Sequence, residues 1–208
     1  MSQRQRDGGG LACTAMPLQR RTVLIGAGAL AGLIGSPLLM NAPRADSEPG
    51  PTQEDLALLR RTFAVAEQAR QSGNTPFGAL VADAGGNVIV ERGNHQAPPE
   101  GDPTQHAEVL ATAAAWHVLG SDGMNQATLY TSAEPCVMCT GAAYWTGIGR
   151  IVYGLSEHRL LELTGDNPEN PTFSLPTRDV LAHGQRAITV IGPLLEDEAA
   201  QTQEGYWG

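Results

Sequence analysis

Residues 129–145 read Leu-Tyr-Thr-Ser-Ala-Glu-Pro-Cys-Val-Met-Cys-Thr-Gly-Ala-Ala-Tyr-Trp, a β-rich run followed by proline and a helix-favouring segment. We expect a strand over Ala127–Ser132 and a helix over Cys136–Trp145, which places both cysteines in the first helical turn. Side chains at positions i and i+3 lie on one helical face, so the two thiolates can close on one ion. The partial positive charge of a helix N-terminus favours the deprotonated thiol. The pair is therefore a candidate metal site.

A second predicted helix start, Asp102-Pro103-Thr104-Gln105-His106-Ala107-Glu108, also follows a proline-bearing loop. A third ligand from His106 gives the three-residue pattern of a catalytic zinc, with the fourth position left for water. Structural zinc takes a fourth protein ligand, and the only other cysteine is Cys13 in the basic head of the chain. The remaining histidines could in principle supply that ligand, but none lies at ligand spacing to the cysteine pair: His95, His117, His158 and His183.

Glu108 follows the expected ligand His106 by two residues. Zinc lowers the pKa of bound water from 15.7 to about 7, so the chemistry still requires a group that moves the proton. The carboxylate of Glu108 can take that proton, pass it to a ring nitrogen and then protonate departing ammonia. The alternative is an acid in the first turn of a helix, stabilised by the helix dipole alone. The neighbouring ligand set favours the catalytic interpretation.

The rest of the chain from residue 52 alternates predicted helices and strands. This order predicts parallel pairing and helices on both faces of one sheet. The other expected helices are Thr52–Gly73, Ala107–Leu119 with Gly120 as its stop, and Leu194–Glu204. The other expected strands are Phe77–Ala84, Asn87–Arg92, Ile148–Gly154 and Ala187–Gly192, and Asp166–Pro176 is expected to be a loop.

Charge is distributed unevenly along the 208 residues, whose formal net charge is −9. Residues 1–45 carry five arginines and one aspartate, so residues 46–208 carry eight arginines against 21 acidic residues, a charge of −13. The chain contains no lysine. An acidic body of this kind lacks the positive patch that neutralises phosphates, which makes a polynucleotide substrate unfavourable.

Residues 1–45 resemble an export signal. Arg20-Arg21 precede an uncharged Gly/Ala/Leu stretch, and small residues around Ala42–Ala45 follow it. This order is typical of a twin-arginine signal, so we expect an exported, periplasmic protein with residues 46–208 as its catalytic domain. The alternatives are an uncleaved anchor over Thr22–Met40, a flexible tail on a cytoplasmic protein, and half of a dinucleotide-binding motif at Gly26-Ala27-Gly28. A reporter fused to residues 1–45 should leave the cytoplasm only while Arg20 and Arg21 are intact. Export of a reporter in which both arginines are replaced would contradict the twin-arginine prediction.

From Pro76 to Gly154 the chain resembles the cytidine-deaminase-like superfamily, whose signature combines H-x-E with P-C-x-x-C. The resemblance rests on Pro76–Ala79, Gly93-Asn94, the Asp102–Glu108 segment and Leu129–Trp145. It implies a three-layer αβα sandwich around a five-stranded mixed sheet, one Zn²⁺ per chain at the three ligands, and Glu108 as acid and base. It also implies that Asn94 and backbone groups near Ala107 and Ser132–Glu134 contact the substrate, and that the protein forms a homodimer.

Within that superfamily the most similar branches are guanine deaminases and tRNA adenosine deaminases. The acidic body, the expected export and Tyr144-Trp145 favour a small base, and we expect guanine or a similar aminopurine. Cytosine, another amino-heterocycle and tRNA adenosine stay open, as does a non-catalytic zinc-stabilised module that binds bases.

Guanine deaminases carry an extra acid after the strand that follows the cysteine helix, and Asp166 is the candidate here. A simple turn aspartate before Pro168 is the alternative. Aromatic residues that could stack on a flat ring, or pack elsewhere, are Phe77, Trp145 and the Tyr206-Trp207 pair.

Overall fold

The computed structural model describes residues 50–168 and 170–207. The expected export signal in residues 1–45 lies outside the described residues, so it stays a prediction. Among the described residues, no helix is both long and apolar enough to cross a membrane.

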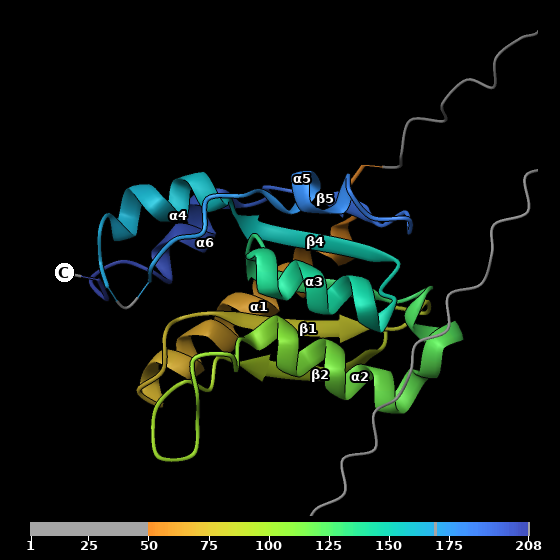
Figure 1. The fold of residues 1–208 in the computed structure, drawn as a ribbon, viewed down its shortest axis with the longest axis horizontal. Helices are drawn as coiled ribbons and strands as arrows, with labels where there is room; N and C mark the ends of the chain where they lie inside the picture. The colour runs from red at the N-terminus through yellow and green to blue at the C-terminus, as the bar shows by residue number, and fades with distance from the viewer. Residues whose placement is uncertain (1–49, 169, 208) are drawn as a thin grey trace, which may run out of the picture. The chain divides into compact units, whose positions relative to one another are not determined.

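A five-stranded mixed sheet forms the centre of the fold, in the order β2-β1-β3-β4-β5 (Figure 1). The strands are β1 (Gly78–Ala82), β2 (Val88–Gly93), β3 (Thr128–Ala133), β4 (Arg150–Leu155) and β5 (Thr189–Ile191). Strand β1 pairs antiparallel with β2 and β3, whereas β3, β4 and β5 run parallel. The predicted five-stranded mixed sheet is confirmed.

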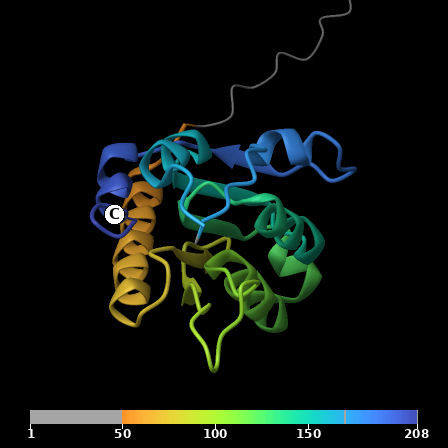
Figure 2. The same cartoon turned by 60° about the vertical axis from the view of Figure 1, so that its left-hand side comes forward.

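Helices cover both faces of the sheet, with α2 and α3 on one face and α1 on the other (Figures 1 and 2). The helices are α1 (Gln53–Gln71), α2 (Ala107–Met124), α3 (Val137–Thr146), α4 (Glu157–Thr164), α5 (Thr177–Leu181) and α6 (Glu196–Gln201). Helices α4 and α5 were not expected from the sequence, although the loop between them was.

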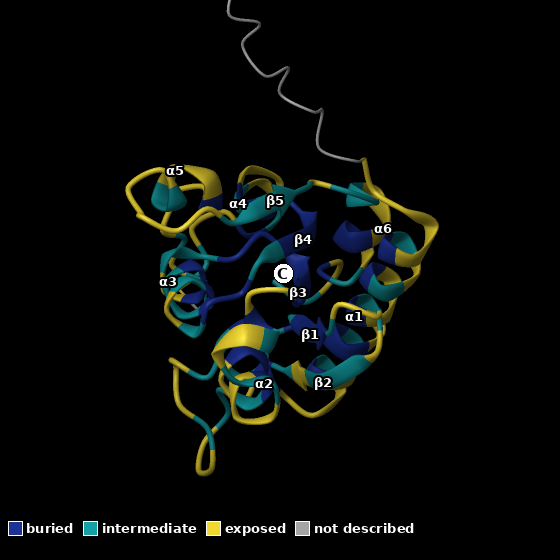
Figure 3. Ribbon diagram, turned by 90° about the vertical axis from the view of Figure 1, so that its right-hand side faces the viewer, coloured by how far each residue is buried: buried dark blue, intermediate teal, exposed yellow. Residues whose placement is uncertain are grey.

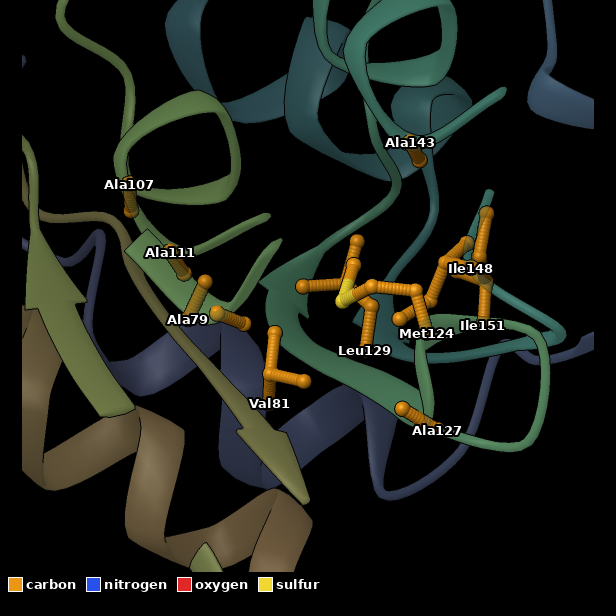
Figure 4. Close-up of a cluster of buried hydrophobic side chains, with 11 residues drawn as sticks. Ala79, Val81, Ala107, Ala111, Met124, Ala127, Leu129, Ala143, Ile148 and Ile151 are labelled. Carbon is orange, nitrogen blue, oxygen red and sulfur yellow. The ribbon is translucent and has the colours of Figure 1, made fainter. Parts of the chain in front are cut away.

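Side-chain alternation along the strands explains the three layers, because successive strand residues point to opposite faces. Ala79, Val81 and Leu129 pack in the α2/α3 layer (Figure 4), whereas Leu80 and Tyr130 pack in the α1 layer. Strands β1 and β3 are buried along their whole length, as the dark strands in Figure 3 show. Strands of a sheet that is covered on both faces are buried throughout. They do not show the alternation of apolar and polar residues that is typical of a half-exposed strand.

Local sequence sets the helix ends. The side chain of Thr52 accepts from the backbone N–H of Asp55, and the Asp55 carboxylate accepts from the backbone N–H of Thr52, so a capping box begins α1. Gly120 breaks α2 with φ 62° and ψ −178°, and a further turn then reaches Met124. The regular helix therefore stops at Gly120 as expected, and α2 as bounded here joins it across this kink to a second short helical segment.

A buried ion pair joins α1 to the amino ends of β3 and β4. Asp55 is 3% exposed, and its carboxylate accepts from Arg150 at 2.6 and 2.8 Å and from the Tyr130 hydroxyl at 2.7 Å. The Arg150 guanidinium holds the pKa of Asp55 well below its ordinary value of 3.8. Three elements of the fold therefore depend on one ionised carboxylate.

Asp55→Asn is expected to lower the free energy of unfolding by about 3 kcal/mol, because it leaves the Arg150 charge partly buried without its partner. Since the folded-state pKa is depressed, the pair stabilises the fold above pH 3.8 and that contribution disappears as the pH falls. Urea unfolding at pH 7 and pH 3 should therefore show a smaller acid-induced loss for the variant than for wild type. Asp122→Asn, at an exposed aspartate, is the control, and equal stability of the two variants at pH 7 would contradict the prediction.

Candidate active site

Three side chains converge where two helices begin. His106 is the N-cap of α2 and Cys136 is the N-cap of α3, both with extended backbone angles, and Cys139 lies in the first turn of α3. Strand β3 ends at Ala133 and delivers the chain to the cysteine helix. Cys136 therefore immediately precedes the first turn of α3 rather than lying within it. Both cysteine sulfurs still lie close to the Nδ1 atom of His106.

The spacing of the three ligand atoms fits a zinc ion. The Nδ1 atom of His106 lies 3.8 Å from the Cys136 sulfur and 3.5 Å from the Cys139 sulfur, and all three ligand atoms lie within 4.8 Å of one another. Tetrahedral zinc with ordinary Zn–N and Zn–S bonds places such atoms roughly 3.6 Å apart. His106, Cys136 and Cys139 are thus positioned to hold zinc, and within residues 50–168 and 170–207 no other group of three or more such side chains is close enough.

Electrostatics at the site also favour a cation. Hydrogen bonding to Cys139 and to His106 lowers the pKa of Cys136 to about 4. A thiolate is the form that binds metal. Both cysteines are free of disulfide bonds.

Glu108 lies in the first turn of α2, directly beside the ligands. Its carboxylate accepts from the Thr131 hydroxyl at 3.0 Å, and its other oxygen is 3.4 Å from the Cys139 sulfur. The side chain is 5% exposed, and burial raises its pKa. A carboxyl group with a raised pKa, held against a metal site, is suited to move a proton.

The site opens into a cavity of about 690 Å³. Its walls include residues 73–75 and 77 before β1, residues 94 and 96–98 after β2, Glu157 and Leu160 of α4, residues 168 and 170–173, and Tyr206. His106, Glu108 and Cys136 contribute to the lining. The reacting groups therefore face a space that a small ring can enter.

Asn94 lines this cavity, but its amide is already engaged by the protein. Its side-chain oxygen accepts from the backbone N–H of Ala107 at 2.7 Å, and its side-chain nitrogen donates to Thr75 and Gln96. Ala107 itself is fully buried, with that N–H committed to Asn94. Their predicted contacts with substrate stay predictions, and in this structure both residues fix the start of α2.

The aromatic candidates separate clearly. Phe77 lines the cavity and Trp207 packs on it with ring centroids 6.2 Å apart, while Tyr206 lines the cavity directly. Gln203 anchors this terminal pair, because it accepts from the Trp207 indole and donates to the Pro76 carbonyl. Trp145 is 82% exposed and does not line the cavity. It therefore does not stack on a substrate ring bound in the cavity of its own chain.

Asp166 is exposed and does not line the cavity, although Pro168 and Asn170 nearby do. It follows Gly165, the residue that ends α4. Asp166 therefore lies in an exposed turn, which agrees with the alternative interpretation as a turn aspartate. A substrate contact by this residue stays a prediction.

Two acidic side chains of the cavity wall were missed from sequence. Glu134 is buried, and its carboxylate accepts from the backbone N–H groups of Glu157 at 3.1 Å and Thr177 at 3.0 Å, which caps both α4 and α5. Glu157 is also buried in the wall. The available signal was Ser156, a residue type that commonly begins a helix, followed by Leu160 and Leu163 on an apolar face.

Comparisons with known proteins agree with this geometry. Residues 52–155 match the family model of the cytidine and deoxycytidylate deaminase zinc-binding region. A probable cytosine deaminase of Schizosaccharomyces pombe is 42% identical over 156 residues, which cover 75% of this chain and 94% of that protein.

Two solved structures are similar in fold. A guanine deaminase from Nitrosomonas europaea matches with a TM-score of 0.61 and 27% identity over 85% of this chain and 96% of that chain. A structure solved in complex with 8-azaguanine matches with a TM-score of 0.63 and 28% identity over 74% of this chain and 85% of that chain. With its zinc ligands in place, this chain belongs to the cytidine and deoxycytidylate deaminase family of zinc-dependent enzymes that hydrolyse carbon–nitrogen bonds.

Proposed function

We propose that this enzyme hydrolyses the exocyclic amino group of guanine or a closely similar aminopurine and releases ammonia. The observation that carries the proposal is the likeness to a guanine deaminase along almost the whole length of that protein. Glu108 and two of the zinc ligands, His106 and Cys136, line one cavity, so the groups for such a reaction are in one place.

The residues divide the work of the reaction. Zinc, when bound by His106, Cys136 and Cys139, supplies an activated water at neutral pH. Glu108 takes one proton from water and delivers it to a ring nitrogen. It then takes the second proton from the hydroxyl added to the amino-bearing carbon and gives that proton to the departing amine. Water and the amino-heterocycle become the oxo-heterocycle and ammonia, and Glu108 ends in its starting state.

The cavity suits a flat ring. The rings of Phe77 and Tyr206 lie in its lining and offer apolar surface against which a base can pack. Polar side chains also line it, including Gln96 and Glu157. A wall of this mixed kind orients a heterocycle by its polar edge while its faces are buried.

Charge supports a small substrate over a nucleic acid. Residues 46–208 carry a formal charge of −13 and no lysine. Phosphate groups approaching this body meet repulsion rather than counterion release. Deamination of a tRNA adenosine is therefore disfavoured, although relatives include tRNA-specific adenosine deaminases.

Cytosine is the second candidate substrate. The fission yeast relative named as a probable cytosine deaminase is 42% identical and covers 94% of its own length in the match. That relative favours cytosine, whereas the structural neighbours favour guanine.

Ammonia release by the full-length, zinc-loaded chain distinguishes these substrates. The panel is guanine, cytosine, adenine, their nucleosides and a tRNA anticodon stem, each assayed for kcat/KM with zinc per chain measured in parallel. We expect the highest kcat/KM for guanine. A higher value for cytosine or for the tRNA stem would replace the proposal, and one zinc per chain without any turnover would favour a non-catalytic base-binding module.

We also propose a homodimer that acts on free bases. Trp145 is 82% exposed and Trp116 is 42% exposed, one on α3 and the other on the neighbouring helix α2. Large exposed aromatic side chains are common where proteins associate. Light scattering during size-exclusion chromatography tests the oligomer, and a monomer mass at micromolar concentration would contradict it.

A further inference from the structure

The mouth of the active-site cavity is apolar. Among the described residues that line the cavity, none of the exposed ones carries a polar or charged side chain. One of them, Gly73, has no side chain. Phe173 is 64% exposed, and a large apolar side chain left open to solvent beside a cavity is typical of a binding surface. The exposed lining side chains, which we call the apolar rim, are Pro98, Pro103, Met138, Pro168, Pro171 and Phe173.

The buried part of the lining is polar instead. Asn94 is 4% exposed, Glu108 is 5% exposed and Glu134 is 7% exposed, and all three line the cavity. Glu108 lies 3.4 Å from the sulfur of a zinc ligand, so the amino-bearing carbon of a substrate has to lie in this buried part. The cavity is therefore polar at the reacting end and apolar where it meets solvent.

The apolar rim offers little to a hydroxyl group. Proline has no backbone N–H, so the prolines of the rim donate no hydrogen bond. Partly buried polar side chains of the lining already bond to one another, since the Thr75 hydroxyl donates to Gln96 and the Asn170 amide donates to the Thr172 hydroxyl at 3.3 Å. A sugar hydroxyl at this end would give up hydrogen bonds to water without equivalent partners, which costs free energy. An apolar group has no such cost and gains from burial.

The size of the cavity leaves room beyond a free base. Its volume of about 690 Å³ lies in the range that accommodates drug-sized ligands, which are larger than guanine. In guanine the amino-bearing carbon belongs to the six-membered ring, and the five-membered ring lies at the opposite end of the molecule. A guanine whose amino-bearing carbon lies beside Glu108 therefore directs its five-membered ring away from the metal site. A substituent on that ring is the group that the apolar rim would contact.

We propose that the apolar rim binds an apolar substituent on the five-membered ring of the base, so that alkylated guanines are substrates in preference to the nucleoside. This inference rests on the proposed guanine deamination and defines its substrate class more narrowly. Water and a guanine alkylated at the sugar-bearing nitrogen give the correspondingly alkylated xanthine and ammonia. The free base is also a substrate, because the polar end of the cavity contacts the part of the ring that reacts.

The test compares guanosine with 9-cyclopentylguanine, in which an apolar ring of similar size replaces the sugar at the same nitrogen. For the zinc-loaded full-length protein, kcat/KM is measured by ammonia release for both compounds and for guanine. Each additional buried CH₂ group is worth about fourfold in affinity. We therefore expect kcat/KM for 9-cyclopentylguanine to exceed that for guanosine by at least about tenfold. Because this ratio is taken within one protein, a general loss of activity cancels from it.

Substitutions in the loop between α4 and α5 connect this ratio to the apolar rim. Phe173→Ser should bring the ratio below about threefold, whereas Phe173→Leu, which keeps an apolar side chain, should retain most of it. Leu175→Ser is the matched control and should keep the wild-type ratio, because Leu175 is 38% exposed in the same loop but does not line the cavity. Zinc content and the thermal midpoint of each variant show that it keeps its metal and fold.

The outcomes separate this inference from the proposed function. A wild-type ratio near one, or the same ratio in Phe173→Ser as in wild type, would overturn the inference while guanine deamination stands. Turnover of guanine with neither derivative accepted would also overturn it, because the rim would then be closed by protein, such as a second copy of the chain. A zinc-loaded wild type that leaves guanine and both derivatives unchanged overturns the proposed function together with the inference.

Discussion

Replacing Glu108 with glutamine is expected to lower kcat by about 10³-fold or more while the protein keeps one zinc per chain. Glutamine has nearly the same shape and can still accept from the Thr131 hydroxyl, which now contacts Glu108 at 3.0 Å. It cannot take up and release a proton. The loss therefore falls on the chemical step rather than on the fold or the metal site.

Single-turnover ammonia release and zinc analysis on the same preparation check this result. Glu162→Gln is the control, since it removes an equivalent carboxylate from an exposed ion pair on α4. Turnover of Glu108→Gln within tenfold of wild type, with full zinc, would refute the role of Glu108 as proton carrier. The site would then need another group to move the proton.

The metal site could be predicted because its information is local. Cys136 and Cys139 are three residues apart, and Glu108 is two residues from His106, so helix geometry alone brings each pair together. Only the approach of the His106–Glu108 pair to the cysteine pair depends on the tertiary fold. For the sheet, the alternation of strands and helices predicted the parallel pairing that β3, β4 and β5 show. The mixed five-stranded sheet was implied by the family resemblance, and its strand order was not predicted.

The cavity wall could not be predicted in this way, because its contacts join distant segments. The amide of Asn94 is occupied by Thr75 and by the N–H of Ala107, 19 and 13 residues away along the chain. Glu134 caps helices that begin 23 and 43 residues later. Sequence spacing carries no trace of such partners, and the Asn94 amide, a residue type suited to bind substrate, is occupied by the protein itself.

Exposure is a second property that residue type does not reveal. Tyr144 and Trp145 are adjacent and both aromatic. Tyr144 does not line the cavity, and its hydroxyl accepts a hydrogen bond from the backbone N–H of Gln185. Trp145 points outward from the same helix. One helical step of about 100° separates a packed ring from an exposed one. The aromatic pair was recognisable from sequence, but the face on which each ring lies was not.

Removing one zinc ligand is expected to abolish both metal binding and activity. Cys139→Ala leaves only His106 and Cys136, whose ligand atoms are 3.8 Å apart, and a two-ligand site binds zinc far more weakly. Because thiolate and imidazole ligands bind zinc only when the fold assembles them, bound metal also stabilises the folded state. We therefore expect zinc to fall well below half an ion per chain and ammonia release to reach background.

Two measurements separate metal loss from misfolding. Elemental analysis after dialysis against a weak chelator gives zinc per chain for wild type, Cys139→Ala and Cys13→Ser, the last being the matched control at the third cysteine of the chain. Thermal unfolding with and without a strong chelator measures how far zinc binding stabilises the fold. The chelator should lower the unfolding midpoint of wild type and of Cys13→Ser but leave that of Cys139→Ala unchanged. A folded Cys139→Ala protein that retains one zinc would remove Cys139 from the ligand set. It would also require a fourth candidate ligand, which the three-membered cluster of the described residues does not contain.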